Sequence, residues 1–140
     1  MDKQTNSTLM RYADEVLRED KCPLFKKDDP TSIYSSYNGQ IAALGVSILM
    51  IGLKPTVSVY YQDKPKDNEA HRQYLLGVIA KMLDKSDSKW KSKLAKEAPY
   101  EKYAIELTRS IMQDDKDTLK TDILNCSIAL KQVIRTYKLD

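Results

Sequence analysis

Apolar residues recur at helical spacing through the stretch 29–61. Over its first part they stand alternately three and four positions apart, at Tyr34, Tyr37, Ile41, Leu44, Ile48 and Ile51. From Ile41 onward the other positions are apolar as well, which is typical of a helix that neighbouring helices surround. Asp29 and Pro30 suit the start of this helix, and Gly52 suits the position that follows its end. The pattern predicts a central apolar helix, with a further helix starting near Pro55.

The rest of the chain shows the same period in several further places. We expect a first helix that Asn6 or Ser7 caps, a helix over 68–83, a short helix over 90–98, a helix from Pro99 to Ile111, and a last helix over 119–137. Gly77 lies inside one of them and indicates either a close neighbouring helix or a plain loss of helix stability. Residues 1–140 are therefore predicted to form a single all-α domain, a compact bundle of about six helices around the central one.

Residues 56–61, TVSVYY, are the ambiguous part of this pattern. Their alternation and β-branched side chains favour a strand when the segment is considered alone. A single six-residue strand without a partner segment elsewhere in the chain is implausible. We therefore predict that these residues are helical.

Composition is that of a globular chain without a membrane segment. The apolar run from Ile41 to Leu53 has 13 residues, whereas crossing a bilayer takes about 20. The first residues contain no apolar segment of the kind found in signal peptides, which favours a cytoplasmic location. Cys22 and Cys126 fit no metal-binding spacing and are interpreted as small core residues.

The sequence contains no recognisable arrangement of catalytic residues. His71 is the sole histidine and is interpreted as a packing residue on a helix face. Asp114, Asp115 and Asp117 lack the glycine and the further oxygen ligands of a calcium loop, so helix capping explains them better. We predict a protein that is not an enzyme and holds neither metal nor cofactor.

A lysine-rich segment is the one functional signal in the charge pattern. Residues 72–96 hold seven Lys and Arg against two Asp, a net charge of +5, although the whole chain carries only +3. Together with Lys54, the candidate phosphate-binding residues are Lys81, Lys85, Lys89, Lys91, Lys93 and Lys96. Trp90 lies among them and could stack on a base. The alternative is a solvated lysine face with Trp90 packed against Leu94.

Residues 45–59, GVSILMIGLKPTVSV, resemble the signature of the small α-helical subunit of the type III-B CRISPR (Cmr) complex. Ile48, Gly52, Leu53 and Thr56 match as fold-determining positions, whereas Gly45, Ser47 and Val59 depart from it. The resemblance implies a non-catalytic structural subunit of an antiviral RNA-silencing ribonucleoprotein. Such subunits stack in the inner filament and help to hold guide and target RNA.

The partners that the resemblance implies are the other Cmr subunits, copies of the same chain, and RNA. One alternative is a helical protein–protein adaptor without nucleic-acid contact, which the nine tyrosines favour because tyrosine is common at interfaces. Another is an enzyme with a dispersed site around His71.

Overall fold

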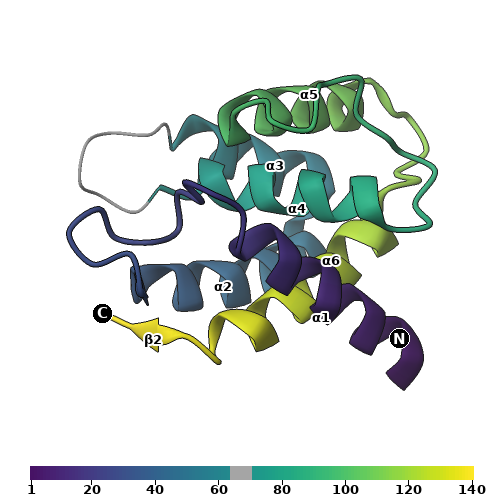
Figure 1. Ribbon diagram of the computed structural model, residues 1–140. Helices are drawn as coiled ribbons and strands as arrows, with labels where there is room; N and C mark the ends of the chain where they lie inside the picture. The colour runs from purple at the N-terminus through teal and green to yellow at the C-terminus, as the bar shows by residue number, and fades with distance from the viewer. Residues whose placement is uncertain (64–70) are drawn as a thin grey trace.

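The computed structural model describes residues 1–63 and 71–140 as an all-α bundle (Figure 1). The helices within these residues are α1 (Lys3–Leu17), α2 (Ser36–Ile51), α3 (Leu53–Gln62), α4 (Gln73–Lys85), α5 (Tyr100–Gln113) and α6 (Lys120–Ile134). Two short strands, β1 (Ser32–Ile33) and β2 (Lys138–Leu139), pair in parallel and bring the C-terminal residues beside the start of α2. One continuous cluster of buried side chains joins all six helices. The predicted fold class is confirmed.

The enclosed helix of the bundle is α4. It packs against α1, α3, α5 and α6, and every residue from Leu75 to Leu83 is buried. Figure 1 shows it in the middle of the molecule, with α5 on one side and α1 and α6 on the other. The prediction that the helix ending at Gly52 is surrounded was therefore wrong. That helix is α2, which packs against α3 and α6 and leaves its outer side exposed.

A sharp corner joins α2 to α3. Gly52 has φ 99° and donates its backbone N–H to the carbonyl of Ile48 at 3.0 Å, which confirms that it ends α2. A positive φ of this kind is natural for glycine and strained for other residues. Across the corner the hydroxyls of Ser47 and Thr56 lie 2.8 Å apart, and the Tyr60 hydroxyl donates to the carbonyl of Gln40 at 2.6 Å. Residues 56–61 are helical, as predicted.

Gly77 marks the closest approach of two helices. A Cβ atom built there would lie 2.4 Å from the carbonyl oxygen of Tyr100, the first residue of α5. That separation is far below normal van der Waals contact, so a side chain cannot be accommodated without moving α5. The prediction of a close neighbouring helix is confirmed.

Several helix boundaries differ from the sequence prediction. Helix α1 begins at Lys3, because the carboxylate of Asp2 accepts the N–H of Thr5 at 2.8 Å and caps it. Helix α2 begins only at Ser36, because Ser32 and Ile33 pair with β2 instead. The last helix ends at Ile134, a turn earlier than expected.

The short helix expected over 90–98 does not form. Residues 86–99 follow an irregular path instead. The carboxylate of Asp84 accepts both the N–H and the hydroxyl of Ser92 at 2.6 Å, and the hydroxyl of Ser88 accepts the N–H of Trp90 at 3.1 Å. Side chains of this type compete with helical hydrogen bonds for the backbone, and here they fix the segment as a loop.

Both cysteines are free and buried, as predicted. Burial raises the pKa of the Cys126 thiol from its ordinary value of 9.0 to about 12, and that of Cys22 to about 11. A thiol whose folded pKa is raised contributes stability below the unfolded pKa and loses it as the pH rises toward the folded value. We therefore expect part of the free energy of unfolding to be lost between pH 9 and 12.

The variant Cys126→Ala tests this expectation. Urea unfolding of the wild type and the variant at pH 8, 9.5 and 11 should show a shallower alkaline loss in the variant. Because the other titrating groups are the same in both proteins, the difference between the two slopes isolates the thiol. Parallel curves of unfolding free energy against pH would contradict the expectation.

Candidate functional site

The outer side of α2 is apolar and exposed. No charged residue occurs between Ser36 and Ile51. Its inner side is buried through Tyr37, Ile41, Leu44 and Ile48. Over the C-terminal half of α2 the exposed fractions are 56% for Val46, 68% for Leu49, 76% for Met50 and 57% for Ile51. We call these four residues the α2 face. Large apolar side chains that are exposed on one segment often mark an interaction surface.

The neighbouring helices flank the α2 face and do not cover it. On one side Ser47 contacts Thr56 of α3. On the other side a Cβ built at Gly45 would lie 3.5 Å from the Ser127 hydroxyl of α6. A shallow hollow lies between these two contacts. Small side chains line the part of it that lies over the N-terminal half of the helix. Its lining residues are Ala42, Ala43, Val46, Ser47, Met50 and Ile51.

The four signature positions lie together at the α2–α3 corner. Ile48, Leu53 and Thr56 are buried, and Gly52 supplies the positive φ of the turn. Because they shape the end of α2, these positions fix the direction in which Leu49, Met50 and Ile51 leave the bundle. Sequence reasoning did not identify the α2 face as a functional surface, although the absence of charge from this stretch was visible.

The candidate phosphate-binding lysines do not share one surface. Lys81 is only 6% exposed, and its ammonium lies 2.6 Å from the Glu19 carboxylate and 4.4 Å from the centre of the Tyr100 ring. Its ammonium is therefore engaged within the protein and has little exposed surface to offer a phosphate. Lys91 donates to the carbonyls of Leu83, Asp84 and Ser86 at the end of α4. A lysine there complements the negative end of the helix dipole.

The remaining lysines divide into two groups. Lys85 is partly buried and forms an ion pair with Glu15 at 3.5 Å. Lys89, Lys93 and Lys96 are exposed along the loop 86–99, whereas Lys54 is partly buried in the first turn of α3. The loop therefore presents these three exposed lysines to solvent, fewer than the sequence suggested.

Trp90 is a packing residue. It is partly buried against the core, as is Leu94, and its indole N–H donates to the Ser110 hydroxyl at 2.8 Å. A tryptophan fixed by this bond anchors the loop 86–99 to α5. The packing interpretation of Trp90 fits this geometry better than stacking on a base.

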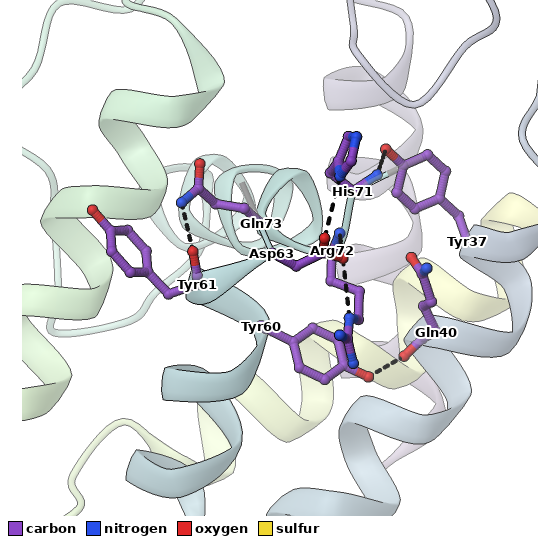
Figure 2. A network of polar contacts seen from close by, with 8 residues as sticks. All are labelled: Tyr37, Gln40, Tyr60, Tyr61, Asp63, His71, Arg72 and Gln73. Carbon is purple, nitrogen blue, oxygen red and sulfur yellow. Dashed lines mark hydrogen bonds and ion pairs between the residues drawn. The ribbon is translucent and has the colours of Figure 1, made fainter. Parts of the chain in front are cut away.

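A partly buried polar network joins the end of α3 to the start of α4 (Figure 2). The Asp63 carboxylate lies 3.2 Å from Nδ1 of His71 and accepts the backbone N–H and Nε–H of Arg72 at 3.0 and 3.1 Å. The backbone N–H of His71 donates to the Tyr37 hydroxyl at 2.9 Å. Burial of Asp63 acts to raise its pKa, but these hydrogen bonds and the Arg72 charge leave the pKa lowered. The network holds the two helices together. His71 is buried, as a packing residue would be, but it lies just before α4 and not on the helix face where it was predicted.

The aspartates near 114 have a structural role of the same kind. The Asp114 carboxylate accepts the N–H groups of Lys116 and Thr118 at 3.0 and 2.9 Å. The carboxylate also accepts the Thr118 hydroxyl. This bond has the largest effect on the pKa of Asp114, and together the three bonds lower it. Within residues 1–63 and 71–140, no group of three or more potential metal ligands comes together.

A broad depression lies between the connector that follows α1 and the start of α5. Its volume is about 1580 Å³, and Cys22, Tyr34, Tyr74 and Lys81 are among its lining residues. Lys26 at its edge pairs with Asp140 at 3.0 Å, and Lys81 at its base pairs with Glu19. The lining therefore combines tyrosines with several lysines, of which Lys26 and Lys81 have carboxylate partners.

Comparison with family models, curated proteins and solved structures returned no match. None of the helices in the described part of the chain has the length and apolar character that a membrane span requires.

Proposed function

We propose that this chain is a non-catalytic structural subunit of a cytoplasmic RNA-guided RNA-silencing complex of the Cmr (type III-B CRISPR) class. The observation that carries the proposal is the α2 face, where four large apolar side chains are exposed on a helix without charge. Removing such a surface from water stabilises an assembly by about 25 cal/mol for each Å² of apolar area buried. A subunit that docks onto a partner would bury this surface, whereas in an isolated bundle the surface stays exposed to water.

The resemblance to the Cmr small subunit supplies the class of assembly. Its signature positions Ile48, Gly52, Leu53 and Thr56 form the corner from which the α2 face projects. A family motif of this kind would preserve the direction of the docking helix, since the buried corner residues determine where α2 ends. The proposal therefore joins the motif and the exposed face in one function.

Assembly through the α2 face can be tested directly. The tagged chain, expressed with the other subunits of a type III-B complex and a guide RNA, should co-purify with them. The double variant Leu49→Glu, Met50→Glu should fold but fail to co-purify, because it would bury charges at the contact. Ile105→Glu is the matched control, since Ile105 is an exposed apolar residue on α5. Equal recovery of both variants would refute docking through α2.

In this complex the loop 86–99 would contact the phosphate backbone of guide or target RNA. Replacing Lys89, Lys93 and Lys96 with Glu should weaken RNA binding by the assembled complex. The slope of log K against log salt should fall by roughly 0.7 for each phosphate that the variant no longer neutralises. The same replacement at Lys3, Lys21 and Lys116, which are exposed lysines elsewhere, should have less effect.

The second candidate function is a protein–protein adaptor without nucleic-acid contact. One observation favours it: Lys81, Lys85 and Lys91 all have partners within the protein, so three of the six lysines between residues 72 and 96 are already engaged. RNA binding that is unchanged in the loop variant, with co-purification still abolished in the α2 variant, would establish the adaptor.

A further inference from the structure

The depression between the connector that follows α1 and the start of α5 has no role in the proposed function. Its volume of about 1580 Å³ exceeds the roughly 300–1000 Å³ of pockets that hold small molecules. Its walls come from the connector, from residues 96–101, and from the side chains of Tyr74, Lys81 and Tyr137. Segments that lie far apart in the sequence therefore enclose a space large enough for an organic ligand.

Aromatic rings form much of this lining. The rings of Phe25 and Tyr137 pack edge to face with their centres 5.4 Å apart, and Tyr34 meets Tyr37 in the same way at 6.2 Å. Phe25, Tyr34, Tyr74 and Tyr137 are partly buried, so part of each ring remains at the surface of the depression. Rings that neighbouring rings hold in place offer faces on which a planar heterocycle can stack.

Charged side chains of both signs complete the lining. The basic residues are Arg18, Lys21, Lys26, Lys27, Lys81 and Lys96, and the acidic residues are Glu19, Asp20, Glu97 and Glu101. The net charge of +2 favours an anion, but a simple anion would also meet four carboxylates. Carboxylates accept N–H and O–H groups. The lining therefore suits a ligand that has an anionic group, a planar ring and hydrogen-bond donors together.

Lys21 holds a backbone conformation that its side chain disfavours. Its φ is 61°, and within residues 1–63 and 71–140 the one other non-glycine residue with a positive φ is Asp117, a type that tolerates it better. Glycine would adopt the same conformation without strain. Residues strained in this way cluster at ligand-binding sites. A lysine at this position, exposed and beside the depression, indicates a use for its ammonium group.

We propose that the depression binds a mononucleotide, with the base stacked on the rings of Tyr34 and Tyr74 and the phosphate beside Lys21. The carboxylates of Glu97 and Glu101 accept hydrogen bonds from the amino group of the base and from the ribose hydroxyls. A nucleotide is the ligand that uses the rings, the ammonium groups and the carboxylates at once. The inference goes beyond the proposed function and does not depend on it, because Lys21 lies outside both the α2 face and the loop 86–99.

Calorimetric titration of the full chain with adenosine 5′-monophosphate (AMP) tests this site. AMP should bind with a Kd below about 1 mM. Adenosine, which lacks the phosphate, and ribose 5-phosphate, which lacks the base, should each bind about tenfold more weakly. Absence of AMP binding would overturn the inference. Equal affinity for AMP and ribose 5-phosphate would also overturn it, because the base would then contribute nothing.

The variant Lys21→Gly separates binding from folding. It removes the ammonium group and keeps the backbone conformation, so AMP binding should weaken by about tenfold while the urea midpoint of unfolding stays the same or rises. Lys116→Gly is the matched control, since Lys116 is an exposed lysine in another loop, and it should bind AMP like the wild type. Unchanged affinity in Lys21→Gly would exclude the proposed phosphate contact.

The variant Tyr74→Leu tests stacking of the base. It should weaken the binding of AMP by about tenfold and leave the weaker binding of ribose 5-phosphate unchanged. A general loss of structure would weaken both ligands equally, and so would a ring that does not contact the base. An equal loss for the two ligands, in a variant that circular dichroism shows to be folded, would overturn the placement of the base.

Competition distinguishes a free nucleotide from RNA. Single-stranded RNA without terminal phosphates should displace AMP only at concentrations well above the Kd of AMP. Displacement at lower concentrations would assign the depression to RNA and overturn the mononucleotide as its ligand. Lys21→Gly should still co-purify with an RNA-guided complex, because it alters neither surface of the proposed function.

Discussion

Replacing Gly77 with alanine should lower the free energy of unfolding by about 2–3 kcal/mol, the range in which overpacked cores lose stability. The added Cβ would meet the Tyr100 carbonyl oxygen at 2.4 Å. That oxygen belongs to the backbone of α5 and cannot rotate away as a flexible side chain would. Tyr100 is held in place at its other end, where its hydroxyl donates to the Val16 carbonyl at 3.1 Å. The clash must therefore separate α4 from α5, and urea unfolding measures the loss.

Gly39→Ala is the matched control for this substitution. Gly39 also lies in a helix, but no atom comes within 4 Å of a Cβ built there. Alanine should therefore raise the free energy of unfolding by about 0.5–1 kcal/mol, because it loses less conformational freedom than glycine. Two variants of equal stability would contradict the close approach at Gly77, since both gain the same helix propensity.

Features that depend on neighbouring residues in the chain could be predicted from the sequence. The α2–α3 corner is such a feature, because Gly52 and the helical spacing on either side of it are local signals. The close approach at Gly77 was also visible, since an interior glycine costs about 1 kcal/mol in a helix unless space demands it. Residues 56–61 were assigned correctly by an argument about missing partners, because their own alternation favoured a strand.

The identity of the enclosed helix could not be predicted in this way. Polar side chains make the sequence of α4 look less buried than α2, but their partners come from distant segments. Lys81 of α4 pairs with Glu19, which is 62 positions away, and just before α4 the backbone N–H of His71 donates to the Tyr37 hydroxyl, which is 34 positions away. The spacing of apolar residues along the chain gives no information about such long-range pairs. The same limit applies to the lysine-rich segment, because residue type reveals a charge but not its partner.

The α2 face shows the opposite mistake, in which an exposed surface was predicted to be buried. A stretch that is apolar on all sides was interpreted as a buried helix, but half of α2 faces outward. Hydrophobicity alone does not distinguish a surface buried in its own chain from one that a partner covers. The absence of charge over sixteen residues is the additional signal, since buried segments such as α4 tolerate a lysine once it is paired.

The ion pair between Lys81 and Glu19 provides the second large expected effect. Glu19→Gln should lower the free energy of unfolding by about 2–3 kcal/mol, because it leaves a buried ammonium without a counter-charge. The full loss for a buried pair is about 3–5 kcal/mol, but the Glu19 side chain is 25% exposed, so solvent screens part of the interaction. The Lys96 carbonyl at 3.3 Å and the Tyr100 and Tyr103 rings remain as weaker partners.

Lys81→Met should lower the free energy of unfolding by less than Glu19→Gln does. The partly exposed Glu19 can be hydrated in that variant, and the methionine fills the space beside the two tyrosine rings. The double variant should therefore be more stable than Glu19→Gln alone, which gives a coupling energy above about 1 kcal/mol in a double-mutant cycle. Glu15→Gln, which breaks the exposed pair with Lys85, should change stability by less than about 0.5 kcal/mol. If urea unfolding gave Glu19→Gln and Glu15→Gln the same small effect, Lys81 would not depend on Glu19. The argument that Lys81 is engaged within the protein would then rest on its burial alone.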